Sequence, residues 1–156
     1  MPAPQIGDHA PAFTLPRDGG DITSLSDFAG QNIVLFFYPK DDTPGCTKEA
    51  IGFTEHLAAF QEANTIVLGV SKDSIKKHDK FAAKHDLKVA LLSDEESQLC
   101  ETFGVWVEKQ MYGKTYMGIE RATYLIDTKG KITNIWRKVK VPGHVEAVLA
   151  AAKALS

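Results

Sequence analysis

Residues 32–49 have the sequence NIVLFFYPKDDTPGCTKE, and this stretch decides the fold. The apolar run Ile33–Tyr38 predicts a buried β-strand. An amphipathic segment follows from Thr47 to about Gln61, and its apolar spacing predicts a helix. The turn between them is rich in Pro, Asp and Gly and carries Cys46. The sequence therefore predicts a thiol at a strand-to-helix turn, in or near the first turn of a helix.

This position favours a reactive Cys46. The N–H groups at the start of a helix have no partner within the helix, and together with the helix dipole they stabilise a nearby anion. A cysteine so placed is biased towards the thiolate, which is the reactive form. A free cysteine is most often a small buried hydrophobe, but the neighbours of Cys46 are Gly, Pro, Thr, Lys and Asp rather than apolar residues. We therefore favour the reactive thiol.

Length, charge and cysteine content limit the class of protein. A chain of 156 residues has the size of one domain with a real core. A net charge of −2 gives no indication of a nucleic acid or a membrane as partner. The first thirty residues lack the apolar segment of a secretory signal. Only two cysteines occur, too few for a disulfide scaffold or a zinc cluster, and this fits a reducing cytosol. We expect one cytoplasmic domain covering residues 1–156.

Periodicity and turn signals predict the remaining elements. The N-terminal segments 11–15 and 22–25 are expected to form a β-hairpin across the turn 18–21, followed by one helical turn at 26–30. Further strands are expected at 65–70 and 89–92, with helices at 75–85 and, after a capping cluster at 93–96, through about 103. A hairpin of 121–126 with 132–136 and a terminal helix at 145–155 complete the chain.

This order predicts the fold class. Alternating strands and helices indicate a parallel core with right-handed crossovers, to which the last hairpin adds antiparallel strands. A helix is expected on each face of the sheet. The prediction is an α/β, thioredoxin-like fold with a central mixed sheet flanked by helices and an N-terminal β-hairpin.

Four residues are candidates to assist Cys46. The hydroxyl of Thr43 can reach the sulfur, or an oxygen bound beside it, although an ordinary N-cap threonine also fits. Pro39 ends the strand and is a candidate to shield the thiolate from water. Glu49 is expected to be a first-turn helix acid with at most a supporting role. Arg121 begins a strand, where a charge is usually solvated; its guanidinium would suit the site, but the sequence alone does not bring it there.

The pattern Pro39-x-x-x-Thr43-x-x-Cys46 resembles the active-site motif of peroxiredoxins. The longer string from Phe37 to Thr47 resembles the PrxQ branch, also called bacterioferritin comigratory protein. Later segments are similar to that branch as well, so the resemblance spans nearly the whole chain. These segments are Gly104-Val105-Trp106, Tyr112-Gly113-Lys114-Thr115, Gly118-Ile119-Glu120-Arg121 and Asp127-x-x-Gly130-Lys131-Ile132.

The resemblance implies a peroxidase for hydrogen peroxide and organic hydroperoxides. Cys46 would be the nucleophile that attacks the terminal peroxide oxygen and becomes a sulfenic acid. The N–H groups of Gly45 and Cys46, the Thr43 hydroxyl and Arg121 would bind the peroxide and stabilise charge on its oxygens, with Pro39 beside them. The reaction would need no metal and no organic cofactor.

The chain departs from the PrxQ pattern in its second cysteine. Many PrxQ proteins carry a resolving cysteine five residues after the first, where this chain has Ile51, and others carry it in the next helix, near 81–84, which has none here. The remaining thiol, Cys100, lies beside the core positions Leu99 and Phe103 and is interpreted as a packed cysteine rather than a resolving one. We therefore expect a one-cysteine cycle in which thioredoxin, glutaredoxin or glutathione reduces the sulfenic acid. A monomer or weak dimer is expected.

Two other functions compete with the peroxidase. A redox-sensing or binding module on the same fold would use Cys46 oxidation without fast turnover. A disulfide oxidoreductase is disfavoured because the chain has no Cys-x-x-Cys motif. The five histidines lack metal-ligand spacing, and the run 76–80 is expected to be a solvated helix face.

Overall fold

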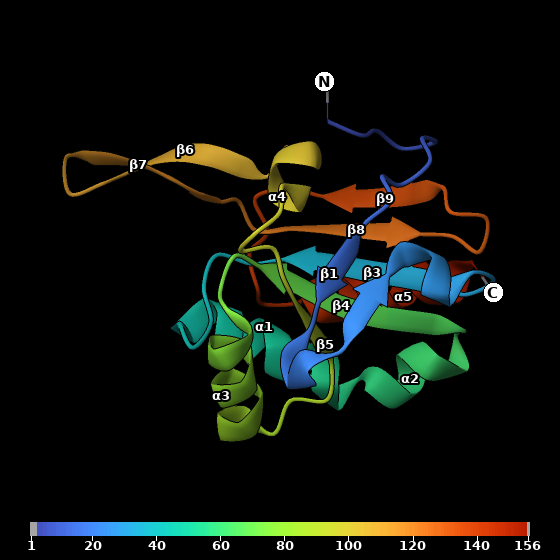
Figure 1. Cartoon of the computed structure of the whole chain (residues 1–156). Helices are drawn as coiled ribbons and strands as arrows, with labels where there is room; N and C mark the ends of the chain where they lie inside the picture. Colours follow the sequence, from blue (N-terminus) through green and yellow to red (C-terminus); the bar gives the residue numbers. More distant parts are fainter. Residues whose placement is uncertain (1–2, 156) are drawn as a thin grey trace.

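The computed structural model describes residues 3–155 and is built on a central five-stranded sheet (Figure 1). The strands of this sheet are β3 (Asn32–Phe37), β4 (Thr65–Ser71), β5 (Ala90–Ser93), β8 (Ala122–Ile126) and β9 (Ile132–Trp136). Their order is β5-β4-β3-β8-β9, with β3, β4 and β5 parallel and with β8 and β9 antiparallel to their neighbours. The predicted mixed sheet is confirmed.

The central strand β3 is buried along its whole length because both faces of the sheet are covered. Ile33, Leu35 and Phe37 lie in one apolar cluster, whereas Val34 and Phe36 lie in another. Successive side chains of a strand point to opposite faces, so the two clusters lie on opposite faces of the sheet. This explains why β3 is continuously apolar rather than alternating.

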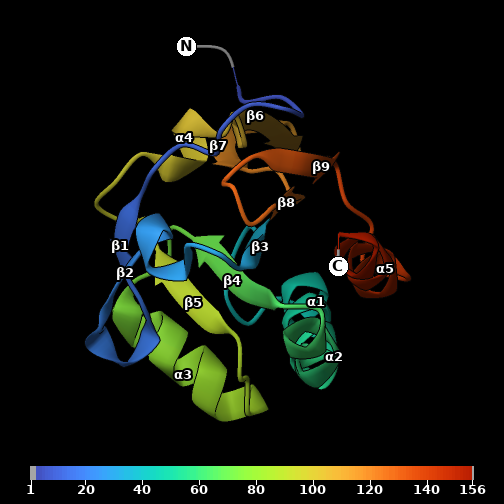
Figure 2. The same cartoon turned by 90° about the vertical axis from the view of Figure 1, so that its right-hand side faces the viewer.

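Four helices pack on the face of Val34 and Phe36. They are α1 (Pro44–Glu55), α2 (Leu57–Glu62), α3 (Ile75–His85) and α5 (His144–Ala154). The other face is covered by the short helix α4 (Leu99–Thr102) and by the N-terminal hairpin of β1 (Thr14–Pro16) and β2 (Ile22–Ser24) with its flanking 3₁₀ turns (Figure 2). Each face therefore has helical cover, as expected, although the two covers differ greatly in size. None of the helices within 3–155 is long and apolar enough to cross a bilayer.

Two expected helices differ in extent. The helix expected at 47–61 begins earlier, at Pro44, and is divided at His56 into α1 and α2. The helix expected after the capping cluster 93–96 is shorter than predicted and comprises only α4. Asp94, a member of that cluster, accepts hydrogen bonds from the N–H groups of Leu99 and Cys100 (2.9 and 2.8 Å) and so caps this helix.

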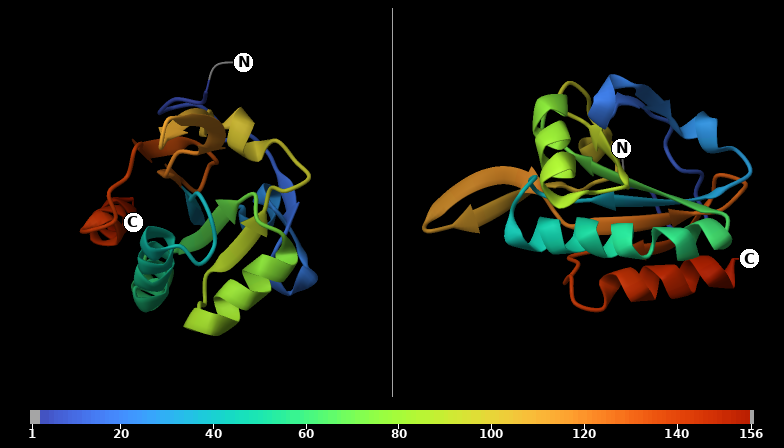
Figure 3. Two further views of the ribbon diagram at one scale, coloured as in Figure 1. Left: turned by 90° about the vertical axis from the view of Figure 1, so that its left-hand side faces the viewer. Right: turned by 90° about the horizontal axis from the view of Figure 1, so that it is seen from below.

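A β-hairpin between α4 and β8 was not expected from the sequence. Strands β6 (Trp106–Met111) and β7 (Lys114–Ile119) pair antiparallel around Tyr112 and Gly113, whose φ values of 53° and 76° suit a tight hairpin turn. The hairpin projects from the end of the molecule where β3 leads into α1 (Figures 1 and 3). Most of its side chains are exposed, so the buried-face alternation that identifies a strand is missing.

Candidate active site

Cys46 is the third residue of α1 and is almost fully buried, with 1% of its surface exposed. The helix starts at Pro44, a position where the missing N–H of proline costs nothing. Its first backbone hydrogen bond runs from Thr47 N–H to the carbonyl of Thr43 (2.8 Å). The N–H groups of Gly45 and Cys46 thus lie in the first turn, where amides have no acceptor within the helix. These two amides remain candidate donors for a group bound at the sulfur.

The sheet brings Arg121 to Cys46 across 75 positions of sequence. Strand β8 begins at Ala122, which pairs with Phe37 at the end of β3. Arg121 therefore lies beside the loop that leads from β3 into α1. Its Nη2 donates to Cys46 Sγ at 3.3 Å, which places a permanently charged donor in direct contact with the sulfur.

Gly45 leaves the space that Arg121 occupies. A Cβ atom at this position would lie 3.1 Å from Arg121 Nη2 and 3.8 Å from its Cζ. A side chain at residue 45 would therefore press on the guanidinium, so glycine here serves a close approach rather than an unusual backbone angle.

Glu49 holds the guanidinium from the other side. Its Oε1 accepts a hydrogen bond from Arg121 Nη1 at 2.7 Å, and its side chain has no exposed surface. Burial raises the pKa of Glu49 to about 7, although the charge and hydrogen bond of Arg121 act in the opposite direction. Within residues 3–155, Glu49 Oε2 has no hydrogen-bond partner. The hydrogen bond of Glu49 therefore holds one side of the Arg121 guanidinium.

His144 lies next to this carboxylate without neutralising it. Its Nε2 is 3.9 Å from Glu49 Oε2 and 2.8 Å from the hydroxyl of Thr123. Burial, and then the charge of Arg121, lower the pKa of His144 to about 4, so the imidazole is neutral at pH 7. The charge partner of Glu49 is Arg121.

Thr43 and Pro39 lie close to Cys46 in sequence but do not bond to it. Thr43 is the N-cap residue of α1, yet its hydroxyl donates to the carbonyl of Lys40 (2.8 Å) rather than capping the helix. Because that hydrogen is used in the bond to Lys40, the Thr43 oxygen can act only as an acceptor towards another group. Pro39 follows the end of β3 and is half-buried.

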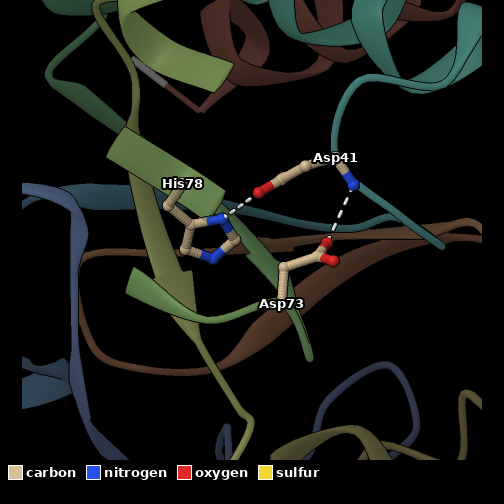
Figure 4. A group of neighbouring side chains, drawn as sticks. All are labelled: Asp41, Asp73 and His78. Carbon is tan, nitrogen blue, oxygen red and sulfur yellow. Dashed lines mark hydrogen bonds and ion pairs between the residues drawn. The ribbon is translucent and has the colours of Figure 1, made fainter. Parts of the chain in front are cut away.

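A buried polar network anchors the loop that precedes Cys46 (Figure 4). Asp41 Oδ2 lies 2.6 Å from His78 Nδ1, and the N–H of Asp41 donates to Asp73 Oδ2 at 2.8 Å. Tyr38 donates its hydroxyl hydrogen to Asp41 Oδ1 at 2.6 Å. The prediction that residues 76–80 form a solvated face is therefore wrong for His78, which is fully buried. The His78 side chain is buried against Asp41, which supplies its hydrogen-bond partner. The sequence pattern of α3 does not indicate this partner.

One proton must lie between His78 and Asp41. The other ring nitrogen of His78 is 2.9 Å from the carbonyl of Leu92, which only accepts, so Nε2 carries a hydrogen. Burial disfavours the charged imidazole, but the hydrogen bond and the charge of Asp41 outweigh this effect, and the pKa of His78 is raised.

One ligand atom from each of Asp41, Asp73 and His78 lies within 4.8 Å of the others, as a cation site would require. These atoms already bond to one another or to their neighbours.

A second link joins the same loop to α3 at the surface. Asp42 has a left-handed backbone (φ 60°), and its carboxylate pairs with Lys84 (2.8 Å) and His85 (3.0 Å). The hydrogen bonds from His85 and then Lys84 lower the pKa of Asp42. Two consecutive residues of the loop that leads to Cys46, Asp41 and Asp42, thus bond to side chains of α3.

The AhpC/TSA family model matches residues 6–135. The chain belongs to this family. It is 52% identical to the putative peroxiredoxin Bcp of Coxiella burnetii over 93% of this chain and 96% of that protein. A Cys-to-Ser mutant of Xylella fastidiosa PrxQ superposes with a TM-score of 0.93 and 44% identity, covering 99% of this chain and 98% of that one. A bacterioferritin comigratory protein of Xanthomonas campestris, studied for alkyl peroxide reduction, superposes with a TM-score of 0.86 and 48% sequence identity. The match covers 91% of this chain and 90% of that one. The chain is therefore a Bcp/PrxQ peroxiredoxin, a thiol-dependent peroxidase.

The second thiol of this peroxiredoxin lies on the opposite face of the sheet. Cys46 packs in the cluster of Val34 and Phe36, whereas Cys100 packs in the cluster of Leu35. Cys100 has no exposed surface. Burial, and then the neighbouring carboxylate of Asp94, raise the pKa of Cys100 far above its ordinary value. A thiol in this state is a poor nucleophile.

Proposed function

We propose that Cys46 reduces hydrogen peroxide and organic hydroperoxides as the nucleophile of this peroxidase. The observation that carries the proposal is the 3.3 Å contact of Arg121 Nη2 with Cys46 Sγ, at the start of α1. The thiolate attacks the terminal peroxide oxygen, an S–O bond forms, and the O–O bond breaks. The sulfur becomes a sulfenic acid, and the peroxide leaves as water or an alcohol once its remaining oxygen gains a proton.

Negative charge moves from sulfur to the two oxygens during this step, and fixed donors lower its energy. Arg121 and the first-turn amides of Gly45 and Cys46 are those donors. The Thr43 oxygen accepts the hydrogen of the peroxide, because its own hydrogen is directed at Lys40. Pro39 keeps water from the sulfur. Glu49 maintains the orientation of the guanidinium.

The cycle uses one cysteine of this chain. A disulfide requires Cα atoms within about 7 Å of each other, and Cys46 and Cys100 pack on opposite faces of the sheet. At the position five residues after Cys46, Ile51 is partly buried in the same cluster as Cys46. An external thiol, from thioredoxin, glutaredoxin or glutathione, therefore reduces the sulfenic acid.

The substrate range includes alkyl hydroperoxides. The support is the relative from Xanthomonas campestris, whose structures were studied for alkyl peroxide reduction. The chain acts as one domain and as a monomer or weak dimer.

Steady-state peroxide consumption tests the proposal. Wild-type protein is assayed with hydrogen peroxide and with cumene hydroperoxide, using thioredoxin, glutaredoxin or glutathione as reductant. Cys46→Ser should abolish consumption with every pair, because a serine hydroxyl is a far poorer nucleophile than a thiolate. Turnover by Cys46→Ser above the rate without protein would refute the assignment. Oxidation of the wild type once, without turnover by any thiol, would favour the redox-sensing alternative.

A further inference from the structure

Lys109 is a half-buried lysine on the β6–β7 hairpin, which projects beside the start of α1. It lies in β6 opposite Tyr116 of β7. Two residues beyond the end of β7 the chain reaches Arg121. Within the described chain, the side-chain ammonium of Lys109 has no hydrogen bond and no ion pair. Partial burial of an unpaired ammonium costs free energy, and a functional role for the charge would explain its position.

The side chain of Lys109 leans towards the base of the hairpin. A Cβ atom added to Gly118 would lie 3.2 Å from Lys109 Cδ and 3.5 Å from its Cε. Gly118 is closer to Arg121 along β7 than Tyr116, the direct partner of Lys109. The aliphatic stem therefore crosses the strand pair diagonally over a glycine, and the ammonium is carried towards the reaction centre.

The ammonium interacts electrostatically with both charged groups of that centre. Burial, and then the charge of Arg121, lower the pKa of Lys109, whereas Cys46 and Glu120 act in the opposite direction. Glu120 is itself held by Arg137 at 2.6 Å. Arg121 bonds to the sulfur of Cys46 and to the carboxylate of Glu49. The charge of Lys109 interacts with the same sulfur, but within residues 3–155 its ammonium has no bonded carboxylate.

The reaction needs a proton that the donors proposed to bind the peroxide do not release. When the O–O bond breaks, the departing oxygen becomes an alkoxide or hydroxide. The guanidinium of Arg121 stays protonated in proteins, backbone amides do not release their hydrogens, and the Thr43 hydrogen is directed at Lys40. An ammonium whose pKa lies below its usual 10.5 holds a proton that it can give up.

We propose that Lys109 is the general acid that protonates the departing oxygen. This inference rests on the proposed role of Cys46. The sulfur lone pair forms the S–O bond, the O–O electron pair goes to the departing oxygen, and that oxygen takes a proton from Lys109. The sulfur loses two electrons and the peroxide gains two. The resulting neutral amine regains a proton from water, which received the thiol proton when the thiolate formed.

The test measures the first turnover of reduced protein with a series of para-substituted cumene hydroperoxides, whose alcohols differ in acidity but not in shape near the oxygens. Lys109→Met should lower the rate constant by about 10²-fold, the lower range for a general acid. It should also make the rate depend more steeply on the acidity of the alcohol. Lys109→Arg should keep the charge yet show the same steep dependence, because a guanidinium does not give up its proton. Lys114→Met, an exposed lysine of the same hairpin, should match the wild type.

The pH dependence gives a second measure. The advantage of wild type over Lys109→Met should disappear as the pH rises through the lowered pKa of Lys109, since only the ammonium can act as an acid. An unchanged rate and slope in Lys109→Met would overturn the inference. Full recovery of both by Lys109→Arg would also overturn it, because charge alone would then suffice. Neither result affects the role of Cys46, which is tested separately by oxidation of its thiol in wild type and by the turnover of Cys46→Ser.

Discussion

Glu49 Oε1 accepts a 2.7 Å hydrogen bond from Arg121 Nη1, between α1 and the start of β8. The second guanidinium nitrogen is thereby directed at Cys46 Sγ. A buried carboxylate is costly unless it is paired, and this one holds a cation that would otherwise sample several rotamers. The reactive sulfur and its cationic donor are therefore fixed relative to each other before any peroxide arrives, which is the condition for electrostatic stabilisation of a transition state.

Replacing Arg121 with alanine should lower the first-turnover rate constant with hydrogen peroxide by about 10²-fold, the loss typical of one transition-state donor. Arg121→Lys should recover only part of the rate, because an ammonium cannot bond Glu49 and Cys46 at once in fixed geometry. Arg17→Ala is the matched control, since Arg17 pairs with its neighbour Asp18 in the N-terminal hairpin and not with the residues around Cys46. Stopped-flow measurement on reduced protein checks the prediction. Equal rates for Arg121→Ala and wild type would contradict the role of the guanidinium.

Glu49→Gln should change how stability depends on pH. The folded-state pKa of Glu49 is raised from 4.5 to about 7, so the folded protein binds a proton that the unfolded chain has released between these values. The contribution of Glu49 is therefore fully present below pH 4.5 and is lost as the pH rises to 7.

The wild type should thus lose on the order of 3 kcal/mol relative to Glu49→Gln over this window, from about 1.36 kcal/mol per pKa unit. Urea unfolding at several pH values measures the difference. Glu55→Gln changes an exposed acid of the same helix and should show no such trend. A constant difference between wild type and Glu49→Gln from pH 4.5 to 8 would contradict the buried, proton-binding state of this carboxylate.

His78→Gln should destabilise the fold by about 3–5 kcal/mol at pH 6, the usual cost of removing one partner from a buried pair. The raised pKa of His78 means that its stabilising contribution is fully present below the ordinary value of 6.5 and is lost as the pH rises through the folded-state value. The gap between wild type and variant, measured by urea unfolding, should therefore narrow at alkaline pH. Lys80→Gln, on the exposed side of α3, should stay within about 0.5 kcal/mol of wild type. A gap that does not change up to pH 10 would mean that the Asp41–His78 proton is not what stabilises the loop.

The reactive position could be predicted from sequence because its causes are local. The apolar run of β3, the turn residues after it and the start of α1 lie within one stretch, and the structure places Cys46 in the first turn of that helix. The proximity of Arg121 depends instead on strand pairing, in which Ala122 lies opposite Phe37. No spacing rule in the chain specifies that register.

The remaining residues around the site escaped prediction for physical reasons. The neighbours of His78 in the sequence of α3 include several lysines, which indicates an exposed helix face. Its burial depends on Asp41, a hydrogen-bond partner 37 positions away in the sequence. The hairpin that carries Lys109 is exposed on both faces, so its strands lack the apolar alternation of a half-buried strand. A turn signal was present in Tyr112-Gly113, where both residues adopt positive φ.

The central claim is that peroxide oxidises Cys46 to a sulfenic acid that no thiol of this chain resolves. Reduced wild-type protein is treated with one equivalent of hydrogen peroxide in the presence of a sulfenate-trapping probe and analysed by mass spectrometry, with Cys100→Ala in parallel. Both proteins should carry the probe on Cys46 at the same yield, and excess peroxide without probe should drive Cys46 to the sulfinic acid. A dominant disulfide between Cys46 and Cys100, formed faster than steady-state turnover, would contradict the account, since it would require two thiols on opposite faces of the sheet to meet in every cycle.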